Sequence, residues 1–409
     1  MSEKSYAFLS ALIPNEKKGE IEKYSRGNMQ DAADALQWHL YNGLCVNLNA
    51  PIQLLNVLPV GSFPQYYKKP FINSFDFATE YCKNNKNIGF CNIKLIRRYI
   101  QQEKVYRVLK YWCKKNKGKK VLFVYTISEM FVTPIRKIKM KYPDIVVCAI
   151  IADLPDMTCL KEKKSLVHRF QEKKYAKQSY KGIGCIDSFV LLTKYMADYM
   201  KLDKPYCVVE GISTYLNESK NIENNNEEKI IMYTGTLHKR FGILNLLEAF
   251  QNISKQEYRL IICGTGDSEE RIKTAAKEDK RIFFKGQLSR NEVLKLQQEA
   301  TVLVNPRQND EEFTKYSFPS KNLEYLSSGI PLVAYKLDGI PDDYDDYIYY
   351  VNGNSIDDLK NKLIEVCEMD IDVRKQKAKE AQQYVWDEKN EIKQTKIIVD
   401  MLKRGSMNG

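Results

Sequence analysis

Residues 229–250 read KIIMYTGTLHKRFGILNLLEAF, which is an apolar run ending at a glycine, a short cationic loop, and a second apolar pattern at helical spacing. The first run predicts a buried strand and the last pattern predicts an amphipathic helix. The same order of strand, loop and helix recurs as far as residue 369. Such alternation is typical of a parallel sheet whose strands are joined by crossover helices.

The second half of the chain therefore predicts one α/β block, followed by a tail helix over 378–405. Its predicted strands are 229–235, 258–266, 281–288, 301–306, 331–335 and 347–352. Its predicted helices are 241–253, 267–279, 289–300, 320–329 and 355–369.

The first half shows the same rhythm, so the 409 residues predict two Rossmann-like domains that face each other. Its predicted strands are 6–13, 44–50, 52–60, 119–127, 144–155 and 206–212, and its predicted helices include 28–44, which ends near Gly43, and 128–143. Residues 213–229 are polar and rich in Asn, as is typical of a linker. We place the domains at 1–214 and 215–385 and the terminal helix at 386–409.

Composition predicts a cytoplasmic protein without a metal site or cofactor. The longest apolar runs, 121–127 and 145–151, are far shorter than the roughly 20 residues that span a bilayer. We expect no export signal, because the apolar part of the first residues is short and no cleavage site follows it. Ten cysteines without a C-x-x-C pair indicate reduced thiols, and three histidines without metal-ligand spacing indicate no His-based metal site.

Positive charge is concentrated in the first half of the chain. Residues 1–214 hold 35 Lys and Arg against 19 Asp and Glu, much of it in 114–120 and 161–182, whereas the rest of the chain is slightly acidic. The basic stretches are either solvated helix faces or a surface that meets an anionic membrane or acceptor, where each cation contributes about 1 kcal/mol. We expect no nucleic-acid partner, because no recognition motif accompanies the charge.

Small residues and cations gather at the predicted strand ends of the second domain. Ligands of parallel sheets bind at these carboxyl ends. Gly235, between a strand and a helix, permits close approach to a phosphate. Lys239, Arg240, Arg307 and Lys321 are predicted at the same edge, where fixed cations stabilise a departing phosphate. The glycines of 264–266 either form a turn or approach a nucleobase.

Four segments together resemble glycosyltransferase family 4, whose members are retaining enzymes of the GT-B fold. The segments are 233–250 (YTGTLHKRFGILNLLEAF), 260–272 (LIICGTGDSEERI), 283–300 (FFKGQLSRNEVLKLQQEA) and 316–334 (YSFPSKNLEYLSSGIPLVA). The first domain fits more loosely, through 6–13, 59–64 and 150–156. The resemblance implies a nucleotide-sugar donor bound by 215–385, an acceptor bound by 1–214, a terminal helix that packs back on the first domain, and no obligatory metal.

Carried over residue by residue, the resemblance places Glu324 at the second glutamate of the family's E-x7-E motif, which implies binding of the ribose hydroxyls. Ser317 and Phe318 match backbone positions that hold the sugar and the diphosphate. Tyr316 stands where the first glutamate is usual. Glu311 and Glu312 either supply a carboxylate near the sugar or belong to a solvated loop.

The family's G-R-x4-K-G cations are also absent, because their positions fall on Thr236 and Phe241. Arg240, Arg307 and Lys321 can replace them, since "PSK" variants of the motif pair a lysine at this point with an upstream arginine. The other interpretation is a degenerate enzyme. We expect activity, because the rest of the cationic edge is present.

The predicted site has three sets of residues. The catalytic set is Asp153, Arg240 and Lys321. The donor-binding set is Gly235, Thr236, Gly264, Gly286, Gln287, Leu288, Arg307, Tyr316, Ser317, Phe318, Ser320 and Glu324. The acceptor-binding set is Asn15, Gly19, Gly61 and Ser62. For Asp153, contact with the sugar or acceptor and a capping role in the turn before Pro155 both stay open.

The sequence thus predicts a retaining hexosyltransferase that uses a UDP- or GDP-sugar and a glycan or lipid-linked oligosaccharide acceptor. We expect it to act in bacterial capsule or exopolysaccharide biosynthesis, at the inner face of the plasma membrane. Three alternatives remain. A sugar-nucleotide epimerase or hydrolase of the same fold would release nucleoside diphosphate without acceptor, a binding homologue would not turn over, and a nucleic-acid binder would show salt-sensitive binding to any duplex.

Overall fold

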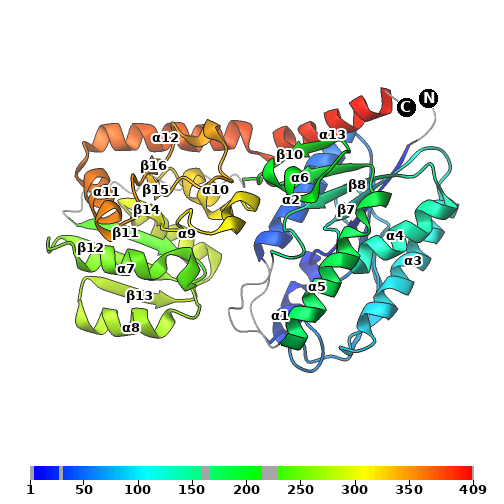
Figure 1. Cartoon of the computed structure of the whole chain (residues 1–409), viewed down its shortest axis with the longest axis horizontal. Coiled ribbons are helices and arrows are strands. Elements are labelled where there is room, and N and C mark those ends of the chain that lie inside the picture. Colours follow the sequence, from blue (N-terminus) through cyan, green and yellow to red (C-terminus); the bar gives the residue numbers. More distant parts are fainter. Residues whose placement is uncertain (1–3, 27–30, 158–165, 214–227, 408–409) are drawn as a thin grey trace. The chain divides into compact units, whose positions relative to one another are not determined.

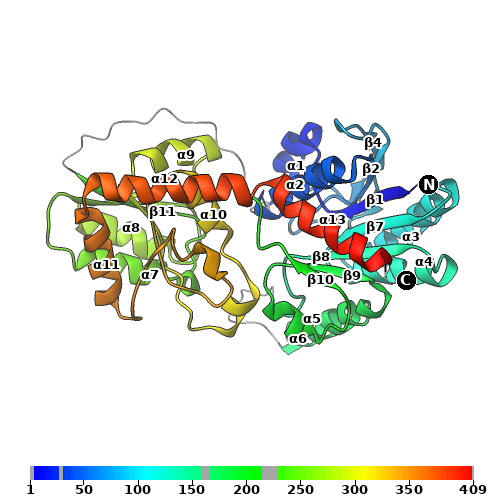
Figure 2. The same cartoon turned by 90° about the horizontal axis from the view of Figure 1, so that it is seen from above.

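The computed structural model describes residues 4–26, 31–157, 166–213 and 228–407, which form two compact units (Figures 1 and 2). Unit 1 comprises Met1–Ile212 and Glu391–Gly409, and unit 2 comprises Ser213–Asn390. Most of the predicted linker, 214–227, lies outside the described residues. Each unit is built on its own parallel sheet.

Unit 1 contains an eight-stranded sheet in the order β10-β9-β8-β7-β1-β2-β5-β4, parallel except between β4 and β5. Its strands are β1 (Ser5–Ser10), β2 (Ile52–Asn56), β4 (Phe75–Phe77), β5 (Asn85–Asn87), β7 (Lys120–Tyr125), β8 (Val146–Ile151), β9 (Ser188–Leu191) and β10 (Tyr206–Val208). A separate antiparallel pair joins β3 (Phe71–Ile72) to β6 (Phe90–Cys91). The central strands are buried on both faces, which explains why their sequences are continuous apolar runs.

Helices cover both faces of the unit 1 sheet (Figures 1 and 2). On one face, α2 (Asp31–Leu48) and α13 (Glu391–Met407) pack together, and Tyr41 of α2 and Ile398 of α13 share one core with Phe8 of β1. On the other face, α3 (Arg97–Lys115) packs against α4 (Glu129–Lys141). The remaining helices are α1 (Lys18–Tyr24), α5 (Leu166–Tyr180) and α6 (Tyr195–Met200).

Unit 2 contains a six-stranded, wholly parallel sheet in the order β13-β12-β11-β14-β15-β16. Its strands are β11 (Lys229–Thr234), β12 (Tyr258–Cys263), β13 (Ile282–Gly286), β14 (Val302–Asn305), β15 (Leu332–Ala334) and β16 (Tyr349–Tyr350). Its helices are α7 (Ile243–Gln251), α8 (Glu269–Glu278), α9 (Arg290–Glu299), α10 (Ser320–Ser327), α11 (Ile356–Glu368) and α12 (Ile371–Glu388). Because every strand runs the same way, all six carboxyl ends lie at one edge of the sheet.

The structure corrects the predicted end of the helix near Gly43. Residues 44–50 were expected to form a strand, but α2 continues through Leu48. A Cβ on Gly43 would lie 2.3 Å from the carbonyl oxygen of Glu391, so this glycine allows α13 to approach α2 closely. Glycine inside a helical pattern therefore marks a packing contact here and not a helix terminus.

The tail is also different from its prediction, because residues 378–405 belong to two helices that are separated at Lys389 and Asn390. This break is the division between the units, so α12, with the buried Trp386, belongs to unit 2. The amide of Ser213 donates to the carbonyl of Lys389 (2.8 Å), which ties the start of unit 2 to its end. The segment that returns to the first domain is therefore α13, from Glu391 onwards, and not the predicted 386–409.

No helix among the described residues is both long and apolar enough to cross a membrane. The nine cysteines in that part of the chain are unpaired. In the same residues, no three side chains of His, Cys, Asp or Glu are grouped as metal ligands would be.

Candidate active site

The carboxyl edge of the unit 2 sheet brings Lys321 onto the backbone of Gly235. Gly235 follows β11 with φ +149°, and a Cβ built there would lie 2.2 Å from Cε and 3.0 Å from Nζ of Lys321. Lys321 is the second residue of α10, whose first turn also offers backbone N–H groups to an anion. The Nζ atom has no ion-pair partner among the residues that the structure describes, so its charge is available to a ligand.

Gly235 was expected to bring its backbone N–H close to a phosphate, but its role in the structure is different. Its N–H donates to the carbonyl of Cys263 (2.9 Å), so that amide is occupied within the strand ends. The value of the glycine is the space that its missing side chain leaves for Lys321.

Two predicted cations lie against one phenyl ring. The guanidinium carbons of Arg240 and Arg307 lie 4.0 and 4.3 Å from the ring centroid of Phe313. Such contacts attract a cation to the ring and are strongest where water is excluded. Phe313, which the sequence did not single out, therefore positions both arginines.

Arg307 is the most buried of the site's cations, with 8% of its surface exposed. One nitrogen, Nη2, donates to Ser317 Oγ (2.6 Å), but Nε has no hydrogen-bond partner in the described part of the chain. Burial and, secondly, the charge of Arg240 lower the pKa of Arg307 to about 10, so the side chain keeps its charge at neutral pH. A buried cation with an unused hydrogen-bond donor is energetically unfavourable unless an anion accepts that hydrogen bond and balances the charge.

Arg240 is already paired, with Glu311. Both carboxylate oxygens of Glu311 accept from its guanidinium, through Nε at 3.3 Å and through Nη2. Glu312 instead accepts a hydrogen bond from the exposed hydroxyl of Tyr316 (3.2 Å). The two acids were expected either near the sugar or in a solvated loop, and Glu311 has a third role, as partner of a predicted catalytic cation.

The carboxylate of Glu324 is held by Gln297 of α9, a residue that the sequence analysis missed. Gln297 Nε2 donates to Glu324 Oε1 (3.0 Å) and lies 3.4 Å from Thr234 Oγ1, and its side chain is fully buried. Thr234 in turn donates its N–H to the buried hydroxyl of Tyr325 (2.9 Å). A polar residue on the buried face of a helix was the signal that could have found Gln297.

The other predicted donor-binding residues lie on loops of the same edge. Gly264 packs backbone to backbone on Gly235, since its Cβ would lie 1.7 Å from the Gly235 oxygen. Phe318 turns its ring into the core, against Tyr344 (5.4 Å between centroids), so only its backbone can face a ligand. Thr236, Gln287 and Ser320 are exposed, and Gly286 and Leu288 are half-buried.

In unit 1, Asp153 follows β8, two strands away from β1, which leads to Asn15. Its side chain reaches solvent, but the surrounding protein excludes enough water to raise its pKa to about 6. Asn15 and Gly19 are exposed at the start of α1, and Gly61 and Ser62 are half-buried. The structure does not place Asp153 in contact with these four acceptor residues.

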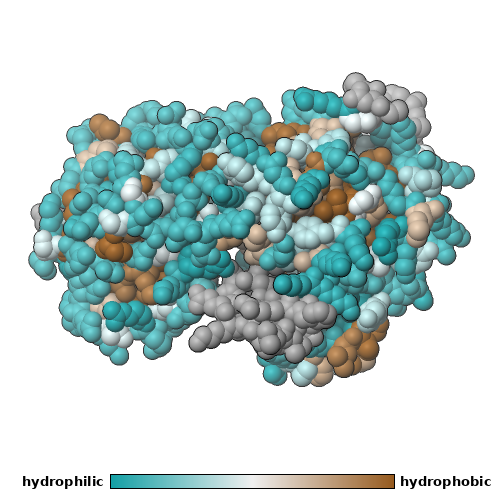
Figure 3. Space-filling view, viewed as in Figure 1, coloured by the Kyte–Doolittle hydropathy of each residue, from teal (hydrophilic) through white to brown (hydrophobic). Residues whose placement is uncertain are grey.

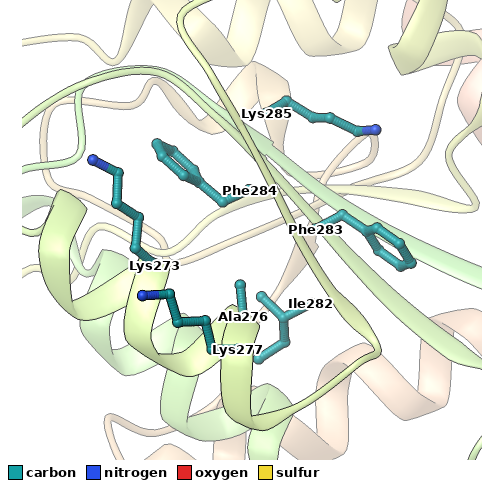
Figure 4. A pocket seen from close by; sticks show the side chains of 7 residues that line it. All are labelled: Lys273, Ala276, Lys277, Ile282, Phe283, Phe284 and Lys285. Carbon is teal, nitrogen blue, oxygen red and sulfur yellow. The ribbon is translucent and has the colours of Figure 1, made fainter.

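A pocket of about 360 Å³ lies on the flank of unit 2, between α8 and the edge strand β13 (Figure 4). Lys273 and Lys277 of α8 lie on one side, with Ile282 and Phe284 facing them, while Phe283 and Lys285 point the other way. None of the predicted site residues lines this pocket, so it does not belong to the site at the strand ends.

Residues 216–384 match the family model described as Glycosyl transferases group 1. The match lies wholly within unit 2 and is a similarity of that unit to the glycosyltransferases of group 1. No curated protein matches the sequence.

Solved structures share the fold over the whole chain. Sucrose-phosphate synthase from Thermosynechococcus elongatus is 13% identical, with a TM-score of 0.65 and 99% of each chain covered. The lipopolysaccharide outer core galactosyltransferase WaaB, in its apo form, is 14% identical, with a TM-score of 0.61, covering 98% of this chain and 99% of that one. A mutant of S. aureus TarM in complex with UDP is 11% identical, with a TM-score of 0.59 and the same coverage.

These likenesses confirm the predicted α/β GT-B fold. The family match in unit 2 supports the predicted glycosyltransferase activity. Its assignment to family 4 and to the "PSK" variant stays a prediction.

Proposed function

We propose that the protein is a retaining hexosyltransferase of family 4 that moves a hexose from a UDP- or GDP-sugar to a glycan or lipid-linked oligosaccharide. The observation that carries the proposal is Lys321, which lies across Gly235 at the start of α10 and has no ion-pair partner among the described residues. A nucleoside diphosphate is the leaving group that suits such a site. The UDP in the TarM complex supports a nucleotide donor.

The cations of the carboxyl edge would act on the departing diphosphate. The bond between the sugar's anomeric carbon and the diphosphate oxygen breaks, and the acceptor's hydroxyl oxygen forms a bond to that carbon. The hydroxyl proton passes to the departing diphosphate oxygen. Lys321, Arg307 and Arg240 would stabilise the negative charge that develops on the phosphate oxygens, most strongly where water is excluded. Because the chain supplies this charge, the proposal needs no obligatory metal or cofactor.

Glu324 would hold the donor's ribose. A carboxylate can accept hydrogen bonds from two neighbouring hydroxyls, and Gln297 fixes its orientation from behind. The motif's first glutamate is replaced by the half-buried Tyr316, so the sugar would be held by the backbone of Ser317 and Phe318.

We place the reaction in bacterial capsule or exopolysaccharide synthesis, in the cytoplasm at the inner face of the plasma membrane. The excess of cations in residues 1–214 supports an anionic surface or acceptor. Asn15, Gly19, Gly61 and Ser62 would contact the acceptor.

Thermal-shift measurements with UDP, GDP, ADP and their sugars test the donor site. One base should raise the melting temperature most, and Lys321→Ala should weaken that nucleotide's affinity about tenfold, the cost of one charge-assisted hydrogen bond. Lys115→Ala, on the basic stretch of unit 1, should leave the shift unchanged. Equal behaviour of the two variants would place the donor elsewhere, and nucleotide release without acceptor would favour the epimerase or hydrolase alternative.

The raised pKa of Asp153 gives a pH dependence. A carboxyl with pKa about 6 is ionised above that pH, so a reaction that uses the carboxylate loses activity as pH falls through about 6. Asp153→Asn should lower kcat/KM at least about tenfold and remove this acid limb. A pH profile of kcat/KM measures both. If Asp153→Asn showed the same loss of kcat/KM at low pH as the wild type, another group would be responsible for that loss, and Asp153 would have only its role in the turn.

A further inference from the structure

Large apolar side chains are exposed together on two neighbouring segments of unit 1, 66–71 (YYKKPF) and 93–99 (IKLIRRY), which we name the tip. Leu95 and Tyr99 are 84% and 72% exposed, and Phe71 is 62% exposed. Of the sixteen large apolar side chains exposed among the described residues, the tip holds six, namely Tyr66, Phe71, Ile93, Leu95, Ile96 and Tyr99. Figure 3 shows apolar atoms gathered at the lower edge of unit 1. Such a gathering is unusual on a protein surface without a partner.

The two segments form one surface, because they are bonded to each other. Phe71 pairs with Cys91 in the β3–β6 ladder, and the amide of Asn92 donates to the carbonyl of Pro70 (2.7 Å). Asn92 Nδ2 also donates to the carbonyls of Gly61 (2.9 Å) and Lys69 (3.3 Å). The apolar side chains are thus presented on a hydrogen-bonded framework.

Arg97 holds the start of α3 against the rest of unit 1, while the residues next to it are exposed to solvent. Its guanidinium donates to the carbonyl of Val60 (2.7 Å) and lies over the ring of Phe90 (5.3 Å). Arg97 points inward, whereas Leu95 and Ile96, just before α3, and Tyr99, in its first turn, are exposed. Their exposure is built into the fold.

The charge of the tip has one sign. Its cations are Lys68, Lys69, Lys94, Arg97 and Arg98, and neither segment contains an acid. Lys69 pairs with Glu20 (2.8 Å) and Arg98 with Glu129 (2.7 Å), while Lys94 is exposed. Aliphatic and aromatic side chains rimmed by lysine are the combination that binds the interface of an anionic bilayer.

We propose that the tip docks on the surface of an anionic membrane. Leu95, Ile96 and Phe71 enter the boundary between headgroups and acyl chains, Tyr99 and Tyr66 lie at the headgroups, and Lys94 and Lys68 meet the lipid phosphates. A protein partner would need acidic groups to match these cations as well as an apolar face. The membrane supplies both over an area larger than the tip.

The tip lies beside the predicted acceptor residues, and the link between docking and acceptor binding rests on the proposed function. Tyr66 packs directly on Gly61, whose Cβ would lie 2.2 Å from that of Tyr66, and Lys69 is bound to Glu20 beside Gly19. The predicted acceptor residues Gly61, Ser62 and Gly19 therefore adjoin the docking surface. An acceptor carried by a membrane lipid would reach them from the bilayer.

Sedimentation with lipid vesicles tests the docking without any activity. Full-length protein is mixed with vesicles of phosphatidylcholine alone, or with about a third of the lipid as phosphatidylglycerol. We expect binding to the anionic vesicles and about tenfold weaker binding of Leu95→Ser/Tyr99→Ser. The matched control, Tyr111→Ser/Met140→Ser, removes side chains that are 66% and 76% exposed elsewhere on unit 1, and should bind like the wild type.

A charge variant separates the tip from general basicity. Lys94→Ala should weaken binding about fivefold, which corresponds to the ~1 kcal/mol of one lysine at an anionic surface, and Lys115→Ala should not. Circular dichroism and the nucleotide thermal shift of each variant establish that it is folded with its donor site intact.

Equal binding of the tip and control variants would overturn the proposal, as would no binding to either vesicle. A dimer in size-exclusion chromatography that Leu95→Ser/Tyr99→Ser abolishes, without vesicle binding, would assign the tip to a second copy of the chain. Because donor binding is measured separately, failure of the docking leaves the glycosyltransferase proposal standing. Loss of the nucleotide shift alone would leave the docking standing.

Discussion

Arg307→Met is expected to lower kcat/KM about a hundredfold to a thousandfold, the loss found when one fixed donor to a developing anion is removed. Arg307 is buried, it is held over Phe313 at 4.3 Å and over Phe241 at 5.7 Å, and it has an unused Nε–H. A cation that is already oriented needs no reorganisation when charge develops on the leaving phosphate. Methionine fills similar space between two rings without the charge.

The same substitution should change the free energy of unfolding of unit 2 by less than about 1 kcal/mol. It removes the hydrogen bond from Nη2 to Ser317, worth about 1 kcal/mol, but it also removes a buried charge that has no ionic partner in the described part of the chain. Arg307→Met is thus expected to lower activity strongly while leaving stability almost unchanged. A residue whose role is only structural would lower both together.

Steady-state kinetics and urea unfolding of the same preparations make the comparison. Arg259→Met is the matched control, since Arg259 lies near the amino end of β12, away from the carboxyl edge, and pairs with Glu228 (2.8 Å). Arg307→Lys keeps the positive charge but lacks the planar guanidinium group, so its kcat/KM should lie between those of the wild type and Arg307→Met. Full activity of Arg307→Met would remove Arg307 from the donor site.

Most of the fold could be predicted because its strands are buried on both faces. Strands such as β11 and β12 are apolar runs that end at glycine, and such runs cannot belong to a solvated element. Helix starts were readable where a capping box is present, as at Ser289 and Glu292 of α9. These signals are local, so they needed no knowledge of the neighbouring elements.

The errors arose where tertiary contacts override a local signal. Gly43 looked like a helix end, but its missing side chain makes room for α13, which is almost 350 residues away in sequence. The contact between Gly43 and α13 is not visible in a short window of sequence. Helix α3 was not predicted, although Val105, Leu109 and Trp112 lie at helical spacing on its buried side.

The sequence could predict which edge of the unit 2 sheet forms the site, but not which side chains contact each other there. Parallel topology alone placed Arg240, Arg307 and Lys321 at the same edge. That Lys321 lies across Gly235, or that both arginines lie against the ring of Phe313, depends on loop conformations that residue spacing does not determine. The orienting residue Gln297 was hidden for the same reason, since its partner Glu324 lies on a different helix.

Gly264→Val should cost unit 2 more than about 3 kcal/mol of unfolding free energy. Gly264 has φ +133°, a conformation that a β-branched residue rarely adopts. Its Cβ would lie 1.7 Å from the backbone oxygen of Gly235, and its amide is bonded to the carbonyl of Gly286 (2.7 Å). The loop is held from both sides, so it cannot move away without separating the ends of β11, β12 and β13.

Gly286→Ala is the control that separates backbone strain from collision. Gly286 has φ +66°, but nothing lies within 4 Å of its Cβ position, so only the left-handed conformation costs energy, about 1 kcal/mol. In a Trp38→Phe/Trp112→Phe background, the fluorescence of Trp386 follows the urea unfolding of unit 2 alone. If Gly264 served only to approach a nucleobase, Gly264→Val would weaken nucleotide binding at unchanged stability. Equal stability losses in the two variants would likewise contradict a collision between the strand ends.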